Sequence, residues 1–187
     1  MSMLKIGIIT GSTRPNRKSP DVAAWVMEIA SKRSDAAYEL VDIQDFELPL
    51  LDEPMPPSMG KYQKPHTQRW ATQIASLDSF VFVTPEYNHG VPAALKNAID
   101  FLFAEWNHKA AGFVSYGGAG GARAVEQLRL VLAELHVATV RAQVLLSLMT
   151  DFESFTTFKQ HANHEKGVAT VLDQVVAWGG SLKQLRG

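Results

Sequence analysis

The side chains best suited to chemistry in this sequence gather in residues 11–20. This stretch holds three cationic and three hydroxyl residues, namely Arg14, Arg17, Lys18, Ser12, Thr13 and Ser19. It precedes a predicted helix, whose free backbone N–H groups and positive dipole end favour an anion. The dinucleotide pattern G-x-G-x-x-G and the P-loop pattern G-x-x-x-x-G-K-[ST] are both absent here. A phosphate monoester therefore fits better than a pyrophosphate, and a basic surface turn is the alternative.

Two further stretches are suited to a flat ring. In residues 84–92, two prolines and a glycine predict an extended backbone that offers main-chain groups edge-on, and Tyr87 adds an aromatic face. Residues 117–121 hold four of the thirteen glycines, so a bulky ligand can approach the backbone closely. The alternatives are a stiff strand-to-helix connection and a flexible turn. Together with the phosphate corner, the two stretches predict a flavin mononucleotide (FMN) site.

Three motifs carry a resemblance to a known family: Gly11-Ser12-Thr13-Arg14, Thr84-Pro85-Glu86-Tyr87-Asn88 with residues 92–98, and Ser115-Tyr116-Gly117-Gly118. The sequence closely resembles the NADPH-dependent FMN reductases, a flavodoxin-like group that includes quinone, azo-dye and chromate reductases. The resemblance runs from the first strand to about Leu135. It implies bound FMN, with NADPH or NADH as the electron donor.

The resemblance also implies which residues surround FMN: Ser12, Arg14, Ser19, Asn16, Arg17, Pro85, Glu86, Tyr87, Asn88, Ser115, Tyr116, Gly117 and Gly118. The first three would bind the phosphate, with the next two assisting. The following four would line the isoalloxazine ring, chiefly through backbone, and the last four would form the opposite wall. No catalytic side chain is assigned, because the flavin supplies the chemistry.

The implied activity is hydride transfer from the nicotinamide through FMN N5 to a quinone or a similar flat small-molecule acceptor, with ping-pong kinetics. A flavodoxin-type electron carrier and a redox-sensing flavin-binding interaction protein remain as alternatives. The resemblance further implies a homodimer or homotetramer whose second subunit helps to close the pocket. Residues 101–106 and a proline-rich connector are candidates for that surface, with ordinary core as the alternative for residues 101–106.

The elements that must position these stretches alternate between strand and helix. We predict strands at residues 3–9, 38–43, 79–84, 110–116 and 138–146, and helices at 20–33, 67–76, 92–103, 122–135 and 165–182. Ser19 is the expected N-cap and Pro20 the first residue of the first helix. Residues 44–65 hold five of the nine prolines and are expected to be irregular.

This alternation predicts an α/β fold: a flavodoxin-like, doubly wound parallel sheet of five strands in the order 2-1-3-4-5, in three αβα layers. We expect residues 1–187 to form a single domain, since a chain of this length suits one.

Composition excludes several other classes. The absence of cysteine removes disulfides, iron–sulfur clusters, thiolate zinc sites and a cysteine nucleophile. The formal net charge of −1 argues against a nucleic-acid partner or a polybasic membrane anchor. No apolar run approaches the roughly 20 residues of a membrane span, so we expect a soluble cytoplasmic protein. His161 and His164 have a metal-like spacing but lack further obvious ligands, and no metal site is predicted.

Overall fold

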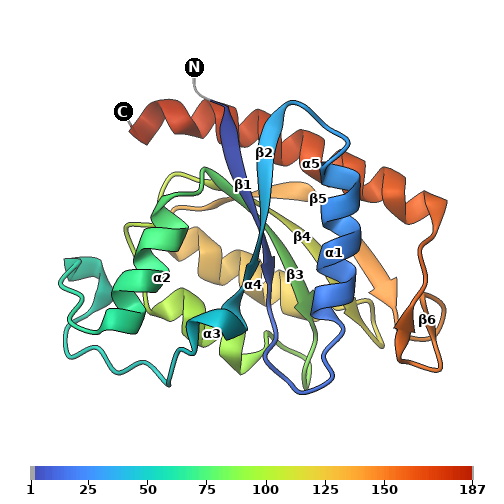
Figure 1. Ribbon diagram of the computed structural model, residues 1–187, viewed down its shortest axis with the longest axis horizontal. Coiled ribbons are helices and arrows are strands. Elements are labelled where there is room, and N and C mark those ends of the chain that lie inside the picture. Colours follow the sequence, from blue (N-terminus) through green and yellow to red (C-terminus); the bar gives the residue numbers. More distant parts are fainter. Residues whose placement is uncertain (1–2, 187) are drawn as a thin grey trace.

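A five-stranded parallel sheet forms the centre of the molecule (Figure 1). The computed structural model describes residues 3–186. The strands are β1 (Leu4–Thr10), β2 (Ala36–Asp42), β3 (Ser79–Pro85), β4 (Ala110–Gly117) and β5 (Ala138–Ser147). Their order is β2-β1-β3-β4-β5 and every neighbouring pair is parallel, which confirms the predicted topology.

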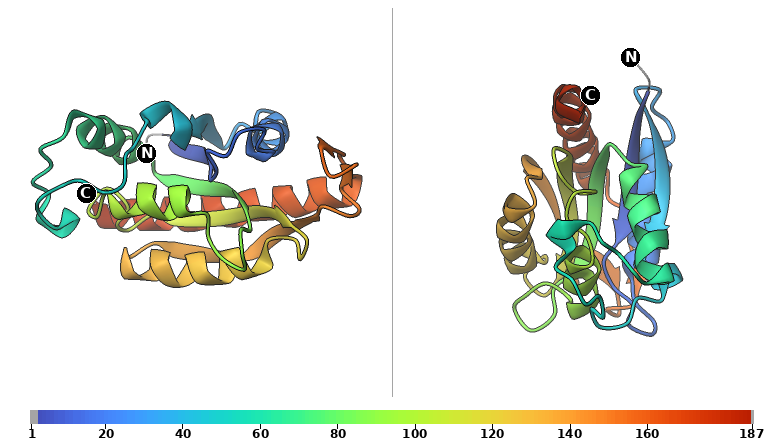
Figure 2. Two further views of the ribbon diagram at one scale, coloured as in Figure 1. Left: turned by 90° about the horizontal axis from the view of Figure 1, so that it is seen from below. Right: turned by 90° about the vertical axis from the view of Figure 1, so that its left-hand side faces the viewer.

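Helices cover both faces of this sheet, as the left view of Figure 2 shows. One face packs against α1 (Ser19–Ala30) and α5 (Ala162–Lys183). The other packs against α2 (Pro65–Ala75), α3 (Ala93–Asp100) and α4 (Ala122–Glu134). Every residue of the inner strands β3 and β4 is buried, because helices cover both of their faces. The layers place the carboxyl ends of β1, β3 and β4 side by side at one edge.

The predicted third helix is too long at its carboxyl end. It ends at Asp100, and the chain then turns back into the core. Phe101, Leu102 and Trp106 are at most 1% exposed, and the Trp106 indole donates a hydrogen bond to the Ile99 carbonyl at 3.1 Å. These three side chains therefore belong to the core and supply no surface for a second subunit.

The start of the first helix also differs from the prediction. Lys18 occupies the N-cap position without a side-chain cap, and Ser19 is the first helical residue. The Ser19 hydroxyl lies 2.8 Å from that of Tyr116, so it is engaged in the interior and is not available for capping.

The segments outside the sheet carry further short elements. As expected, residues 44–65 are largely irregular, with 3₁₀ turns at Ile43–Phe46 and Pro57–Met59. A two-stranded antiparallel hairpin, β6 (Phe152–Glu153) and β7 (Thr157–Phe158), was not predicted. Within residues 3–186, no helix combines the length and apolar character that a membrane crossing requires.

Candidate functional site

The three predicted stretches meet around one cavity at the carboxyl edge of the sheet, where ligands of doubly wound folds bind. The cavity measures about 390 Å³. Eight of the predicted residues line it, namely Arg14, Asn16, Arg17, Pro85, Glu86, Tyr87, Tyr116 and Gly117. Ser12, Ser19, Asn88, Ser115 and Gly118 do not line it. The structure thus brings together part of each predicted stretch.

The loop between β1 and α1 offers donors that the protein itself leaves unused. Within residues 3–186, the backbone N–H groups of Ser12, Thr13 and Asn16 donate to no acceptor. Arg14 is exposed, with its guanidinium carbon 5.9 Å from the centre of the Tyr87 ring. Asn16 adopts a positive φ of 58°, a conformation that asparagine tolerates better than most residues. The loop is therefore rich in hydrogen-bond donors, which suits an anion.

Arg17 is less free than the sequence predicts. Its guanidinium pairs with Asp42, which lies at the end of β2 and also accepts a hydrogen bond of 2.7 Å from Thr10. Nε of Arg17 is nevertheless buried and has no partner in the described part of the chain. Asp42 thus orients Arg17 and leaves its Nε–H group free to donate to a ligand. This contact could not be predicted from the sequence, because β2 and the loop are distant along the chain.

Two predicted phosphate residues instead brace the tyrosines of the rim. Ser12 is fully buried with its hydroxyl 2.8 Å from that of Tyr87, and Ser19 forms the matching pair with Tyr116. Burial raises the pKa of Tyr116 to about 12, although the hydrogen bond from Ser19 and the backbone amides of Lys18 and Ser19 oppose the rise. Tyr116 therefore keeps its proton at neutral pH.

The loop after β3 is a tight turn, which corrects the predicted extended backbone. The backbone groups of Tyr87 and Gly90 form two mutual hydrogen bonds of 3.1 Å each, and Asn88 and His89 have positive φ angles of 47° and 70°. The turn places Asn88 at the exposed tip.

Glu86 anchors that loop to the start of α4. Its side chain is 5% exposed and forms an ion pair with Arg123, whose backbone N–H also donates to it at 3.0 Å. Its own backbone N–H donates to the Tyr116 carbonyl at 3.1 Å. The charge of Glu86 is thereby balanced within the protein, although the residue lines the cavity.

The glycines after β4 serve different purposes. A Cβ at Gly121, where φ is +75°, would lie 2.9 Å from the Tyr116 nitrogen, so packing within the protein requires glycine there. Gly117 lines the cavity, and a Cβ at Gly118 would meet nothing within 4 Å. Ser115 points inward and donates to the Gly120 carbonyl at 2.7 Å. Within residues 3–186, the N–H groups of Gly118 and Ala119 donate to no acceptor.

Five further lining residues were not among those predicted to surround FMN: Pro15, Lys18, Leu148, Phe155 and Thr156. Lys18 belongs to the predicted cationic cluster but was not assigned to the site. Phe155 and Thr156 come from the unpredicted hairpin. Their one sequence signal is the recurrence of phenylalanine at every third position, at Phe152, Phe155 and Phe158.

A larger, more open cavity of about 730 Å³ lies between the loops after β1 and β2 and helix α3. Its lining contains Asp45 and Glu47 but no lysine or arginine. It is therefore poorly suited to a phosphate, and the smaller cavity is the better candidate for the anion.

The paired histidines of the sequence do not form a metal site with other residues. His164 and His161 approach the carboxylate of Asp151, at 2.9 and 3.6 Å. No group of three or more potential ligands suited to a metal ion occurs in residues 3–186.

The fold places this protein among the flavodoxin-like α/β proteins, with a donor-rich cavity at the carboxyl edge of the sheet. The chain belongs to the NADPH-dependent FMN reductase family, whose sequence profile matches residues 4–151.

Relatives in sequence support this family, and a solved structure shares the fold. An NAD(P)H-dependent FMN reductase of Schizosaccharomyces pombe is 44% identical over 149 residues, covering 79% of this chain and 74% of that protein. One from Saccharomyces cerevisiae is 41% identical over 148 residues, covering 73% and 78%. A 2-hydroxy-1,4-benzoquinone reductase of Burkholderia is 27% identical over 188 residues, covering 94% and 96%. The flavoenzyme FerB of Paracoccus denitrificans has a similar fold, with a TM-score of 0.74 at 19% identity over 96% of this chain and 98% of that one.

Proposed function

We propose that this protein is an FMN-dependent NAD(P)H oxidoreductase that reduces quinones or similar flat acceptors. Family membership and the names of the relatives support an oxidoreductase with FMN and a nicotinamide donor. The observation that carries the proposal to this cavity is the surplus of hydrogen-bond donors that the loop between β1 and α1 shows within residues 3–186, in a cavity that Tyr87, Tyr116 and Gly117 also line.

The donor-rich end suits the phosphate of FMN. The side chains of Arg14, Asn16 and Lys18 line it, and the buried Nε of Arg17 has no partner within residues 3–186. The start of α1 adds its dipole, which favours negative charge. Each hydrogen bond between these groups and a phosphate would be charge-assisted and correspondingly strong. We assign the phosphate to this corner.

The other end suits a flat ring. Pro85, Tyr87, Tyr116 and Gly117 line it, and a volume of about 390 Å³ lies within the range of small-molecule sites. Gly117 contributes only backbone to this lining, which lets a ring approach closely there. We therefore assign Pro85, Glu86, Tyr87 and Gly117 to the ring.

The chemistry that FMN supplies when bound is acceptance of a hydride from NAD(P)H and its transfer to an acceptor. The protein holds the ring and places N–H groups where negative charge develops. The amides of Gly118 and Ala119, which have no acceptor in the described chain, are suited to that task. No side chain is required as an acid or base. Donor and acceptor would use the same open side in turn, which predicts ping-pong kinetics.

We further propose that the chain is one domain and assembles as a homodimer or homotetramer. With residues 101–106 largely in the core, the proline-rich connector is left as the candidate surface. Leu50 is 84% exposed there and Met59 47% exposed, and burying these apolar side chains against a partner would be favourable. Light scattering after size-exclusion chromatography tests the assembly, and a monomer at micromolar concentration would contradict it.

The decisive experiment has two steps. Purified protein, with FMN added if needed, is expected to show flavin absorption bands, and protein that stays colourless would overturn the FMN assignment. Anaerobic stopped-flow mixing with NADPH or NADH is then expected to bleach the bands within one turnover. Bound flavin that neither nucleotide bleaches would favour the alternative, an electron carrier or redox-sensing protein.

A further inference from the structure

The β6–β7 hairpin extends beyond the part of the chain that the family profile matches, which ends at residue 151. It projects from the carboxyl end of β5 (Figures 1 and 2). Phe155 and Thr156 at its tip nevertheless line the same cavity as the cationic loop after β1. The hairpin thus reaches back over the site from the opposite end of the sequence.

The tip of the hairpin has an unfavourable conformation. Ser154 and Phe155 both have positive φ, at 48° and 58°, which costs about 1–3 kcal/mol per residue when no glycine is present. Phe155 is 59% exposed, although burial of an aromatic ring is strongly favourable. A strained turn that presents an uncovered ring to a cavity fits a contact completed by a ligand.

The base of the hairpin, in contrast, is fixed by Asp151. This carboxylate is 7% exposed and accepts hydrogen bonds from the Ser147 amide at 2.7 Å and the Thr150 hydroxyl at 3.1 Å. Its other oxygen lies 2.9 Å from Nε2 of His164, at the start of α5. The Asp151 carbonyl also accepts from the Lys159 amide at 2.8 Å. One residue therefore joins β5, the returning end of the hairpin and α5.

A chain of aromatic rings connects this base to the wall of the cavity. Phe152 lies 5.8 Å from Tyr116 and 5.4 Å from Phe158, measured between ring centres, and Phe158 lies 5.1 Å from Trp25. These contacts hold the hairpin against α1 and β4. This packing at the base of the hairpin sets the position of its tip.

We propose that the β6–β7 hairpin is a flap that retains bound FMN by placing Phe155 over the cavity, and that Asp151 is the positioning residue for this flap. The inference rests on the proposed FMN site. Its consequence is kinetic, because a cover that is lost mainly speeds ligand departure and affects arrival less.

The test measures the rate of FMN release from the loaded protein, trapped with an excess of an apo-flavoprotein. Phe155→Ala is expected to release FMN about tenfold faster than wild type, the effect of roughly 1.4 kcal/mol of lost ring contact. Phe155→Tyr should restore slow release. Met149→Ala is the matched control, since Met149 is 70% exposed in the neighbouring turn but does not line the cavity.

The role of Asp151 is tested by the position of the hairpin tip as well as by the rate of FMN release. Bound flavin should quench the fluorescence of the tryptophan introduced by Phe155→Trp. The quenching is measured relative to the protein without this substitution. Adding Asp151→Asn should reduce this quenching and speed release, while the four native tryptophans serve as the baseline.

Release from Phe155→Ala at the wild-type rate would overturn the flap and leave the proposed function standing. Unchanged quenching in the Asp151→Asn protein would overturn the positioning role. Wild-type protein that binds no FMN would overturn both the flap and the proposed function. Because Phe155 lies on the surface, its variants test the flap even if Asp151→Asn fails to fold.

Discussion

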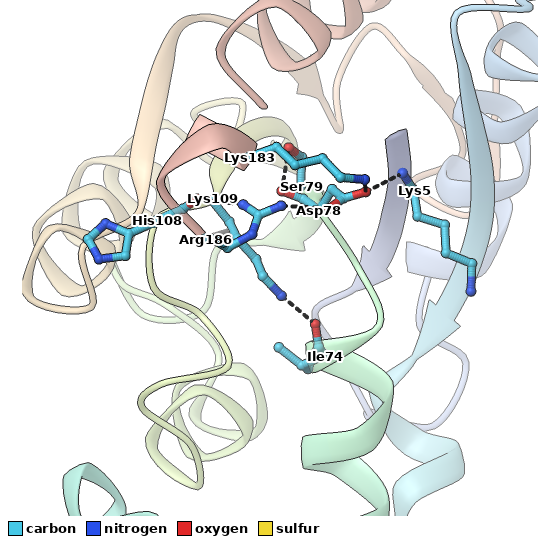
Figure 3. A network of polar contacts seen from close by, with 8 residues as sticks. All are labelled: Lys5, Ile74, Asp78, Ser79, His108, Lys109, Lys183 and Arg186. Atoms are coloured by element: carbon cyan, nitrogen blue, oxygen red, sulfur yellow. Dashed lines mark hydrogen bonds and ion pairs between the residues drawn. The ribbon is translucent and has the colours of Figure 1, made fainter. Parts of the chain in front are cut away.

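The two ends of the sheet carry polar clusters of opposite character. At the amino ends of the strands, Asp78 accepts hydrogen bonds from the Lys5 amide at 3.0 Å, from Lys183 at 2.8 Å and from Arg186 at 2.6 Å (Figure 3). Burial alone would raise the pKa of Asp78, but the hydrogen bond from Lys183 and those from its other partners hold it below the ordinary value. Nearby, the buried ammonium of Lys109 donates to the Ile74 carbonyl at 2.7 Å.

At the carboxyl ends, donors exceed acceptors. Arg14 is exposed, Nε of Arg17 is buried without a partner in residues 3–186, and backbone N–H groups of the same loop are unused. Buried polar groups are costly unless they are hydrogen-bonded. The difference supports two different roles: we expect the cluster whose charges satisfy one another to stabilise the fold, and we propose that an anionic ligand pairs with the surplus donors at the other end.

The largest effect is expected from disrupting the cluster around Asp78, in which every charge has a partner. Asp78→Ala leaves the Lys5 amide, Lys183 and Arg186 without their shared acceptor and should lower the free energy of unfolding by about 3 kcal/mol. FMN affinity should remain unchanged, because the substitution lies at the opposite end of the strands. Urea denaturation and a flavin titration measure the two quantities.

A matched control for that substitution is Asp173→Ala, which removes an exposed carboxylate paired with Arg33. Exposed ion pairs contribute little, so a loss below about 1 kcal/mol is expected. Equal losses for the two variants would mean that saturation of the Asp78 cluster adds nothing to stability.

The next effect concerns the donor-rich loop between β1 and α1. Arg14→Ala should leave stability unchanged and weaken FMN binding by about 1.5–3 kcal/mol, or roughly tenfold to a hundredfold in Kd. Riboflavin lacks the phosphate, so its affinity should be the same for both proteins. An equal loss for riboflavin would place Arg14 against the ring through Tyr87, 5.9 Å away, and not against the phosphate.

The sequence predicted what depends on local pattern. Alternating apolar runs and helical periodicity determine five strands with four crossovers, and right-handed connections then leave few topologies. The proposed phosphate corner rests on the same local logic, since cations and hydroxyls precede a helix start, and it stays a prediction. These features need no knowledge of distant contacts.

The sequence failed where the outcome depends on contacts between distant segments. Ser12 and Ser19 were expected near phosphate, but the structure pairs them with Tyr87 and Tyr116, which are distant along the chain. The early end of α3 at Asp100 follows from burial of Trp106 in the core. The hairpin that carries Phe155 is too short for any periodicity to reveal it.

A smaller effect concerns Lys109, the buried cation near Asp78, and is seen in how the stability of the fold depends on pH. Burial, aided by the charge of Arg186, lowers the pKa of Lys109 from 10.5 to about 8. Between these values the unfolded chain keeps a proton that the folded protein has lost, so stability should rise with pH. We expect a gain on the order of 1 kcal/mol between about pH 8 and 9.5.

Lys109→Met should abolish this rise, because it removes the titrating group while keeping an apolar side chain of similar length. The window ends before pH 10, since the raised pKa of Tyr116 acts in the opposite direction above that point. Thermal unfolding measured across the window tests the expectation. A rise of the same size in the variant would show that other groups cause it.

The smallest effect sharpens the comparison within the site itself. Tyr87→Phe removes the hydroxyl that pairs with the buried Ser12 at 2.8 Å and keeps the aromatic face. In the free protein the substitution should cost about 0.5–1.5 kcal/mol of stability, the contribution of one hydrogen bond. If the Ser12 hydroxyl braces the rim in both states, the FMN-loaded variant should lose the same amount. If Ser12 instead turns to the phosphate when FMN binds, the loaded protein should lose little. Thermal unfolding of both forms therefore decides whether the Ser12 hydroxyl keeps its hydrogen bond to Tyr87 or binds the phosphate when FMN is present.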